Sequence, residues 1–159
     1  MPATIYSAEY YYTTVRDAPG QGCRFLETLA AEEVNLLAFN AFPVGKDTMQ
    51  LVIYPLNSVW LGRMARHEGL ELTGPHHAFI VHGDDELGAL LEIHRKLCDA
   101  EINISSSNGI TDGRGGYRYI LHVHPADFSR ARDVLGVRED VSTAADFHLE
   151  FHRRFEAKS

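Results

Sequence analysis

The sequence has little cysteine, few basic residues and no long hydrophobic run, and each shortage excludes a class of protein. Its two cysteines, Cys23 and Cys98, have neither a metal-binding spacing nor the pattern of a disulfide framework. No run of about 18 apolar residues is present, as a membrane-spanning helix would require. The first residues lack the basic end and apolar stretch of an export signal. These shortages predict a reduced, cytoplasmic protein without a membrane partner.

The charge balance is acidic, which bears on the choice of partner. Lysine and arginine number 15 against 22 aspartates and glutamates, and the net charge is −7. A field of this sign repels phosphate backbones, so we expect no nucleic-acid partner. Hydrophobic residues make up 45% of the 159 positions, enough to build the core of one domain or of two small ones.

The sequence also lacks the familiar signatures of catalysis. It contains no nucleophile-elbow, zinc-protease, P-loop or dinucleotide-binding motif, and neither cysteine lies in a Cys/His or Cys-x-x-Cys setting. The glycine-rich stretch 113–116 joins two predicted strands, so it is a hairpin turn and not a phosphate-binding loop. We therefore predict a protein with no catalytic residues and no cofactor.

An internal repeat is present at an offset of 68 residues. Residues 17–45 align with residues 85–113 without a gap, and seven of the 29 aligned positions are identical. The identical pairs are Asp17/Asp85, Gly20/Gly88, Leu29/Leu97, Glu33/Glu101, Asn35/Asn103, Asn40/Asn108 and Gly45/Gly113. Because polar and glycine positions are among them, duplication explains the match better than chance.

Each half of the repeat follows the same order of elements. The patterns of the first half predict strands over 10–15, 34–42, 49–54 and 70–73, with helices over 22–33 and from Asn57 or Ser58 to 67. Those of the second half predict strands over 78–82, 102–108 and 117–124, with a helix over 85–99 and another that begins at Asp127 as its cap. The order β-α-β-β-α-β is typical of a ferredoxin-like fold.

We therefore predict an α+β protein of two ferredoxin-like units, each with an antiparallel sheet and two helices on one face. The first domain covers residues 1–74 and the second covers 75–140, with residues 74–77 as a short linker. A helical tail covers 141–159, in which Phe147, Phe151 and Phe155 form an apolar stripe.

These features resemble the ACT domain, a small-molecule regulatory module with the same element order. The resemblance rests on Asp17-Ala18-Pro19-Gly20 after the first strand, on Val34-Asn35-Leu36 at the start of the second, and on their counterparts Asp85, Gly88 and 102–104. It implies that domains pair side by side. It also implies that an amino acid or a related ligand binds where the first turn of one domain faces a strand of its neighbour.

The residue types at these turns suit such a ligand. A glycine permits a sharp turn, the following helix offers unpaired N–H groups to a carboxylate, and an aspartate accepts hydrogen bonds from an ammonium group. An asparagine can donate or accept. The predicted ligand-binding residues are Asp17, Ala18, Pro19, Gly20, Gln21, Gly22, Asn35, Asp85, Gly88 and Asn103.

The two turns differ in charge, and this difference ranks them. Arg16 adjoins the first turn and can help to hold a carboxylate. The second turn has three consecutive acids, Asp84, Asp85 and Glu86, and lacks the proline. We therefore expect the better amino-acid site at the first turn, and an empty, altered or cation-preferring site at the second.

Nine histidines suggest an alternative function. His122 and His124 alternate onto one face of a predicted strand, and His82 lies on a strand expected beside it. Three converging imidazoles would form a site for zinc or nickel. His148 and His152 share a helix face in the predicted tail. The alternative is thus a metal-binding or metal-responsive protein, although a plain polar sheet face explains the same pattern.

The preferred interpretation is a non-catalytic regulatory sensor of an amino acid or related metabolite. Because no catalytic or DNA-binding domain is visible, its output must pass through a protein partner or through its own oligomer. Edge strands expose unpaired backbone groups that proteins usually cover. We therefore expect a homodimer.

Overall fold

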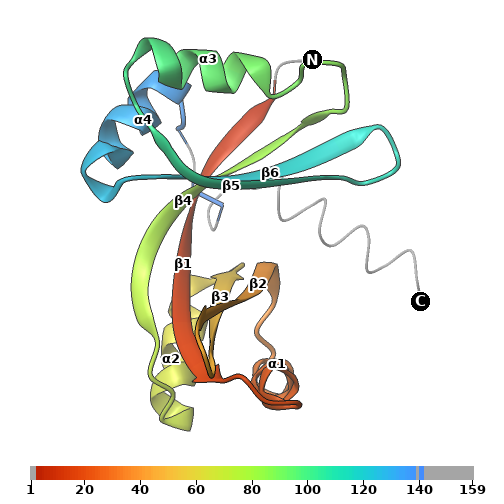
Figure 1. Ribbon diagram of the computed structural model, residues 1–159, viewed down its shortest axis with the longest axis vertical. Coiled ribbons are helices and arrows are strands. Elements are labelled where there is room, and N and C mark those ends of the chain that lie inside the picture. The colour runs from red at the N-terminus through yellow and green to blue at the C-terminus, as the bar shows by residue number, and fades with distance from the viewer. Residues whose placement is uncertain (1–2, 139, 142–159) are drawn as a thin grey trace. The chain divides into compact units, whose positions relative to one another are not determined.

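The computed structural model of the chain describes residues 3–138 and 140–141. The strands are β1 (Thr4–Arg16), β2 (Leu36–Gly45), β3 (Thr48–Pro55), β4 (Thr73–Asp84), β5 (Ile104–Thr111) and β6 (Gly116–Val123) (Figure 1). The helices are α1 (Gln21–Ala31), α2 (Ser58–Glu68), α3 (Leu91–Asp99) and α4 (Phe128–Leu135), with a 3-10 turn, η1 (Pro125–Asp127), before α4. β3 pairs antiparallel with β1 and β2, and β6 pairs antiparallel with β4 and β5. The predicted α+β class with an antiparallel sheet is confirmed.

The chain divides into two compact units. The first unit is Glu9–His76, and the second combines Met1–Ala8 with His77–Ser159, as far as these ranges are described. β1 and β4 therefore contribute residues to both units. The strands that contribute to the first unit follow the order β2-β3-β1-β4, and those that contribute to the second follow β1-β4-β6-β5. The sequence pattern did not indicate that residues 3–8 belong to the second unit.

The core of the first unit follows the periodicities of its elements. Phe25 and Leu29 are one helical turn apart on α1, and Leu51 and Ile53 alternate along β3. All four are buried, together with Leu61 and Met64 of α2. Asn57 caps α2 by accepting a hydrogen bond from the Trp60 N–H at 3.0 Å, as predicted.

The core of the second unit lies between β6 and the helices α3 and α4, which lie side by side on one side of the sheet in Figure 1. β6 alternates strictly, with Tyr117, Tyr119, Leu121 and Val123 buried. Ile93, Leu97, Ala131 and Leu135 of the two helices pack against them. The unit therefore buries one sheet face under two helices.

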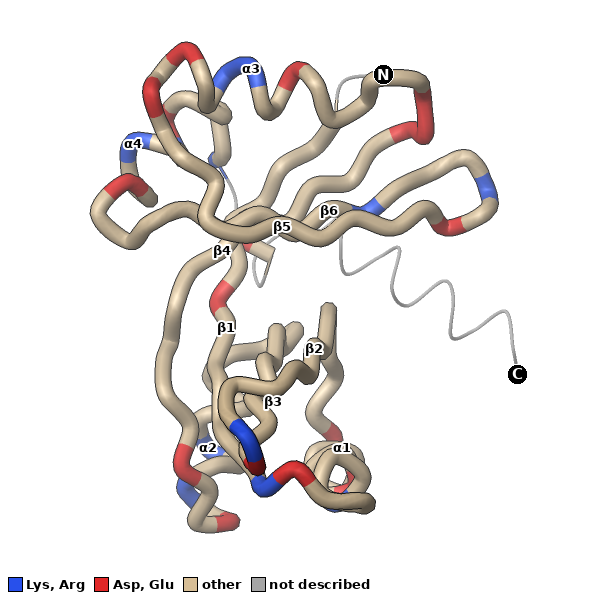
Figure 2. The backbone as a smooth tube through the Cα atoms, in the orientation of Figure 1, with Lys and Arg blue, Asp and Glu red and all other residues tan. Residues whose placement is uncertain are grey.

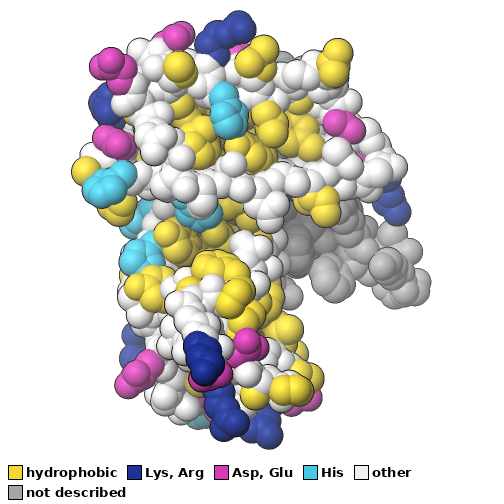
Figure 3. Space-filling model, viewed as in Figure 1, with side chains coloured by type: hydrophobic (Ala, Val, Ile, Leu, Met, Phe, Trp, Pro, Cys, Tyr) yellow, Lys and Arg dark blue, Asp and Glu magenta, His cyan; other side chains and the backbone are white. Residues whose placement is uncertain are grey.

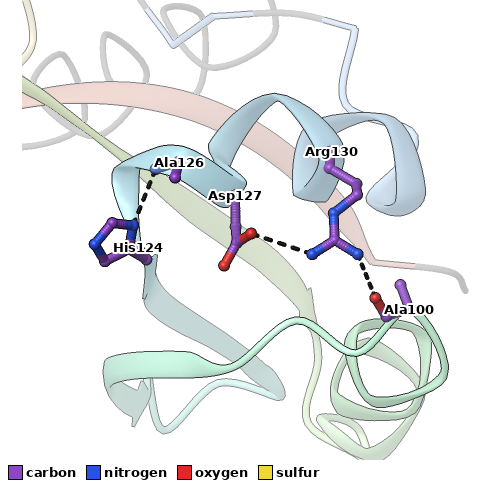
Figure 4. Close-up of polar contacts among 5 residues, drawn as sticks. All are labelled: Ala100, His124, Ala126, Asp127 and Arg130. Atoms are coloured by element: carbon purple, nitrogen blue, oxygen red, sulfur yellow. Dashed lines mark hydrogen bonds and ion pairs between the residues drawn. The ribbon is translucent and has the colours of Figure 1, made fainter.

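An arginine connects the two helices of the second unit. The Arg130 guanidinium donates to the Ala100 carbonyl at the end of α3 and pairs with the Asp127 carboxylate at 3.1 Å (Figure 4). Asp127 occupies the N-cap position of α4, but its side chain makes no capping hydrogen bond. The prediction of Asp127 as the N-cap residue is therefore correct in position. Its side chain does not cap the helix, because its carboxylate pairs with Arg130.

The predicted linker at residues 74–77 contains the boundary between the two units, which falls between His76 and His77, but these residues lie within the continuous strand β4 and form no turn. The sequence Gly-Pro-His-His is typical of a turn, yet Gly74 meets a different requirement. A Cβ at Gly74 would lie 2.9 Å from the Tyr10 carbonyl oxygen and 2.8 Å from the Tyr11 ring. Glycine is therefore needed for a close approach between strands and does not mark a break.

The helix predicted over 85–99 also begins later than expected. Residues 85–90 form a turn, and α3 starts only at Leu91. Gly88 has φ of 77°, a left-handed conformation that does not belong to a helix. The predicted tail, including its Phe stripe and His148/His152, lies outside the described residues except for Val141. None of the described helices has the length and apolar character needed to cross a membrane.

Candidate functional site

The first predicted turn connects β1 to α1 and is fixed by the neighbouring hairpin. The Asp17 N–H donates to the carbonyl of Asp47, in the β2–β3 hairpin, at 2.8 Å. Gly20 has φ of 88° and occupies the N-cap position of α1, where no described side chain caps the helix. The helix start therefore presents backbone N–H groups, as predicted. Asp17, Pro19 and Gly20 are exposed.

Asn35 does not lie near this turn in its own unit. It precedes β2, where its carbonyl accepts a hydrogen bond from the Leu56 N–H at 2.9 Å. The turn is hydrogen-bonded to Asp47, which follows the last residue of β2, whereas Asn35 precedes its first residue. The strand β2 spans Leu36–Gly45. At about 3.3 Å per residue the two ends are roughly 30 Å apart. The same argument separates Asn103, which precedes β5, from the turn of the second unit.

The second predicted turn repeats this geometry. The Asp85 N–H donates to the Gly115 carbonyl of the β5–β6 hairpin at 2.8 Å, as Asp17 does to its hairpin. No described side chain caps α3 either. Glu33 and Glu101, also 68 residues apart, have φ of 56° and 55° after their helices. The two turns are therefore built alike, although their sequences differ.

A cavity of about 500 Å³ adjoins the second turn. It lies between the start of α3 and the strands β5 and β6, and Figure 3 shows hydrophobic side chains gathered between α3 and β5. Two of the predicted site residues, Asp85 and Gly88, line it. Its other lining residues are Ala89, Leu90, Leu91, Gly109, Ile110, Thr111 and Tyr117. Leu91 and Ile110 are 56% and 72% exposed, so the rim is apolar.

Tyr117 is the residue of this region that the sequence argument missed. Only 6% of its surface is exposed, and its hydroxyl has no hydrogen-bond partner among the residues that the structure describes. Burial, with smaller contributions from the Asp84 and Glu92 carboxylates, raises the pKa of this phenol, so the hydroxyl stays protonated at neutral pH. The available signal was an aromatic residue at the start of a predicted strand, whereas its pairing with Gly83 is visible only in the structure.

A second cavity of about 230 Å³ also adjoins Tyr117. It has more charged residues in its lining than the first, namely Asp84, Glu86, Glu92 and Lys96, beside Gly83 and apolar residues such as Ile5, Ile93 and Leu135. The three acids of the second turn are thus divided between the cavities. Asp85 is among the residues that line the larger one, whereas Asp84 and Glu86 are among those that line the smaller one; Gly88, Ala89 and Tyr117 line both.

The predicted convergence of three histidines is wrong. His82 pairs with Arg118, four residues along β6 from His122, which separates them by about 13 Å. The His122 ring is hydrogen-bonded to the Ser106 hydroxyl at 3.0 Å. The His124 ring accepts from the Ala126 N–H at 3.1 Å in the turn before α4 (Figure 4). Strand register therefore separates His82 from His122, and these three histidines form no group of metal ligands in the described part of the chain.

The described residues do contain another group of possible metal ligands. Glu32, His67 and Glu68 each offer one ligand atom, and these atoms lie within 4.8 Å of one another. His67 and Glu68 already interact at 3.1 Å, and 75% of the His67 side chain is exposed. The exposed contact between His67 and Glu68 therefore forms without a bound ion.

Comparison with known proteins identifies the fold. No family model and no curated protein sequence matches the chain. Among solved structures, the chain is similar to protein BT0572 from Bacteroides thetaiotaomicron, with a TM-score of 0.71 and 13% identity over 89% of this chain and 99% of that one. It is also similar to the ligand-free regulatory subunit of aspartate kinase from Thermus thermophilus, with a TM-score of 0.56 and 14% identity over 87% and 98% of the chains.

A third similar structure contains the aspartokinase alpha and beta subunits, with a TM-score of 0.51 and 15% identity over 85% of this chain and 95% of that one. At these identities the likeness concerns the fold. The aspartate kinase regulatory subunits are ACT-domain proteins. The chain therefore has the fold of ACT-domain proteins, as the motifs in its sequence predict.

Proposed function

We propose that this protein is a non-catalytic regulatory protein that binds an amino acid or a closely related metabolite. In this proposal it consists of two ferredoxin-like units, and the ligand binds at the turn between a first strand and a first helix. The observation that carries the proposal is the cavity of about 500 Å³ at the second turn. Its volume falls within the 300–1,000 Å³ that is usual for small-molecule sites.

The lining of this cavity suits the parts of an amino acid. The Asp85 carboxylate can accept hydrogen bonds from an α-ammonium group, and the uncapped start of α3 attracts an α-carboxylate. Leu91 and Ile110 offer apolar contact to a side chain. Gly88 lets the backbone turn sharply beside the ligand.

The division of the acids between two cavities changes the preferred site. Asp84 and Glu86 argued against an amino acid at the second turn as long as all three acids were taken to crowd one site. Only Asp85 lines the larger cavity, so a single carboxylate remains there to meet the ammonium group. We therefore prefer the second turn, and the first turn becomes the alternative site.

The output of binding is also part of the proposal. The solved regulatory subunits of aspartate kinase bear the name of the enzyme that they regulate, and we propose that this chain likewise acts on a protein partner or through a homodimer in the cytoplasm. β5 lies at an end of the strand order and nearly all of its residues are exposed, so it can pair with a second copy.

Calorimetry with the twenty standard amino acids tests the proposal. For the best ligand, Asp85→Ala should weaken binding by about 10- to 150-fold, because a hydrogen bond to a charged group contributes about 1.5–3 kcal/mol. Asp17→Ala is the matched control at the equivalent turn and should change the affinity little. Equal losses would assign both turns to binding, and a larger loss in Asp17→Ala would return the site to the first turn. No binding by any amino acid would contradict the ligand class.

A further inference from the structure

Three side chains that can ligate a metal converge at the helix ends of the first unit. Glu32 is the C-cap residue of α1, and His67 and Glu68 are the last two residues of α2. Each offers one ligand atom, and the three atoms lie within 4.8 Å of one another. Figure 2 shows acidic residues near both helices. The set differs from a plain acidic cluster, because it includes an imidazole, a ligand that suits transition metals.

The distances in this set fit a single small ion. The His67 Nδ1 and Glu68 Oε1 atoms are 3.1 Å apart. In a tetrahedral zinc site with bonds of about 2.0–2.2 Å, two ligand atoms are separated by roughly 3.4 Å. Neighbouring residues of a helix do not normally face each other, yet these two do. The His67 side chain is largely exposed, so a small rotation can bring it and Glu32 onto one ion.

The electrostatic surroundings favour a cation. The C-terminal end of a helix carries partial negative charge, so a carboxylate there is destabilising and a cation is stabilising. Glu32 and Glu68 both lie at such ends. Within the described part of the chain neither carboxylate pairs with a lysine or an arginine, although Arg66 is present in the last turn of α2. A divalent ion would neutralise this concentration of negative charge.

Hydrogen bonds fix the backbone that carries these ligands. The indole N–H of Trp60, in the first turn of α2, donates to the Glu32 carbonyl at 2.8 Å. The Glu32 N–H in turn donates to the Thr28 carbonyl at 3.1 Å. The end of α1 is therefore held against α2 without any ion, and little ordering of the backbone is needed when one binds.

We propose that Glu32, His67 and Glu68 bind one divalent transition-metal ion, such as Zn²⁺. The imidazole discriminates against Mg²⁺ and Ca²⁺, which prefer oxygen ligands. Three protein ligands leave a fourth position of a tetrahedral ion open to water or to another ligand. The site lies within the first unit, whereas the proposed amino-acid cavity lies within the second. A failed amino-acid screen would therefore leave this proposal intact.

Trp60 provides a local test, because it is the only tryptophan in the sequence. Paramagnetic Ni²⁺ bound beside Glu32 should quench the Trp60 fluorescence of the full chain, prepared without a histidine tag. Added Zn²⁺ should displace the nickel and restore the fluorescence, whereas the same concentration of Mg²⁺ should not. Because the chain has nine histidines, this local signal assigns the site better than the total heat of metal binding does.

Two variants and one matched control assign the ligands. Glu32→Gln and His67→Gln should each raise the Ni²⁺ concentration for half-maximal quenching by at least about 10-fold, since losing a residue that merely holds a ligand already costs about 10- to 100-fold. Glu71→Gln makes the same chemical change as Glu32→Gln at an exposed position three residues beyond α2, and it should leave the quenching unchanged. Circular dichroism checks that each variant is folded.

Several results would overturn the proposal. Absence of quenching at millimolar Ni²⁺ would show that no ion binds beside Trp60. Unchanged quenching in both Glu32→Gln and His67→Gln would place the ion elsewhere. An equal loss in Glu71→Gln would reduce the effect to overall charge, and displacement of nickel by Mg²⁺ as readily as by Zn²⁺ would leave only an unspecific attraction of cations.

Discussion

Replacing Tyr117 with phenylalanine should stabilise the protein, contrary to the usual effect of changing a buried residue. In the unfolded chain the hydroxyl bonds to water, whereas in the folded chain it is buried with no partner in the described part of the molecule. Burying such a group costs about 1–3 kcal/mol. Only 6% of Tyr117 is exposed, and phenylalanine keeps its buried ring and removes only the oxygen. The free energy of unfolding of Tyr117→Phe should therefore rise by about 1–3 kcal/mol.

The structure offers a matched control on the same strand. Tyr119 is also buried, but its hydroxyl is hydrogen-bonded to His94 Nε2 at 2.7 Å. Tyr119→Phe removes this bond and should lower the free energy of unfolding by about 0.5–1.5 kcal/mol. The same substitution two residues apart thus has opposite predicted signs.

Urea unfolding monitored by circular dichroism measures both variants. For a domain of 60–100 residues, the size of each unit, each kcal/mol corresponds to about 4–8 °C in Tm, so thermal unfolding offers a second readout. If Tyr117→Phe were destabilised as much as Tyr119→Phe, the hydroxyl would have a partner and the reasoning would be refuted.

Three further predictions concern stability and assembly. Burial lowers the pKa of His122 against the raising effect of Ser106, so the folded protein binds a proton less readily than the unfolded chain. Stability should therefore fall as the pH drops below about 6.5, and His122→Gln should flatten urea-unfolding profiles between pH 7.5 and 5; an unchanged profile would contradict this. Gly74→Ala should lose about 1–3 kcal/mol in the same assay, because its Cβ would collide with the Tyr10 carbonyl oxygen; a neutral effect would show that β4 can shift. Light scattering should give about twice the 17.8 kDa of one chain at micromolar concentration, and a monomer mass would argue against pairing through edge strands.

The element order could be predicted because each element has a local signal. Apolar residues at helical spacing identify α1 through Phe25 and Leu29, and strict alternation identifies β6. The left-handed Gly20 follows from turn chemistry, whereas the left-handed Gly88 lies within the range predicted as a helix. Where a signal had two physical meanings, the prediction failed. Gly74 could mark a turn or a close approach of two strands, and only the neighbouring strand shows which applies.

The candidate site was predictable in part for the same reason. Asp85 and Gly88 belong to a local turn, so a short motif identifies them. Tyr117, Ile110 and Thr111 reach the same cavity from strands more than 20 residues further along the chain. The histidine site was predicted wrongly because a local pattern was used to infer a distant contact. Alternation along β6 placed His122 on the correct face of the sheet, but it carried no information on the register between β4 and β6.

The sequence by itself determined the kinds of element, their order, the repeat and the turns, since these depend on interactions between residues close together in the chain. The tertiary structure decided what depends on distant contacts. It distributed the three acids of the second turn between two cavities, placed the Tyr117 hydroxyl against Gly83 and carried β4 through the apparent linker. Strand register and packing set these outcomes, because they bring together residues whose separation along the chain carries no local signal.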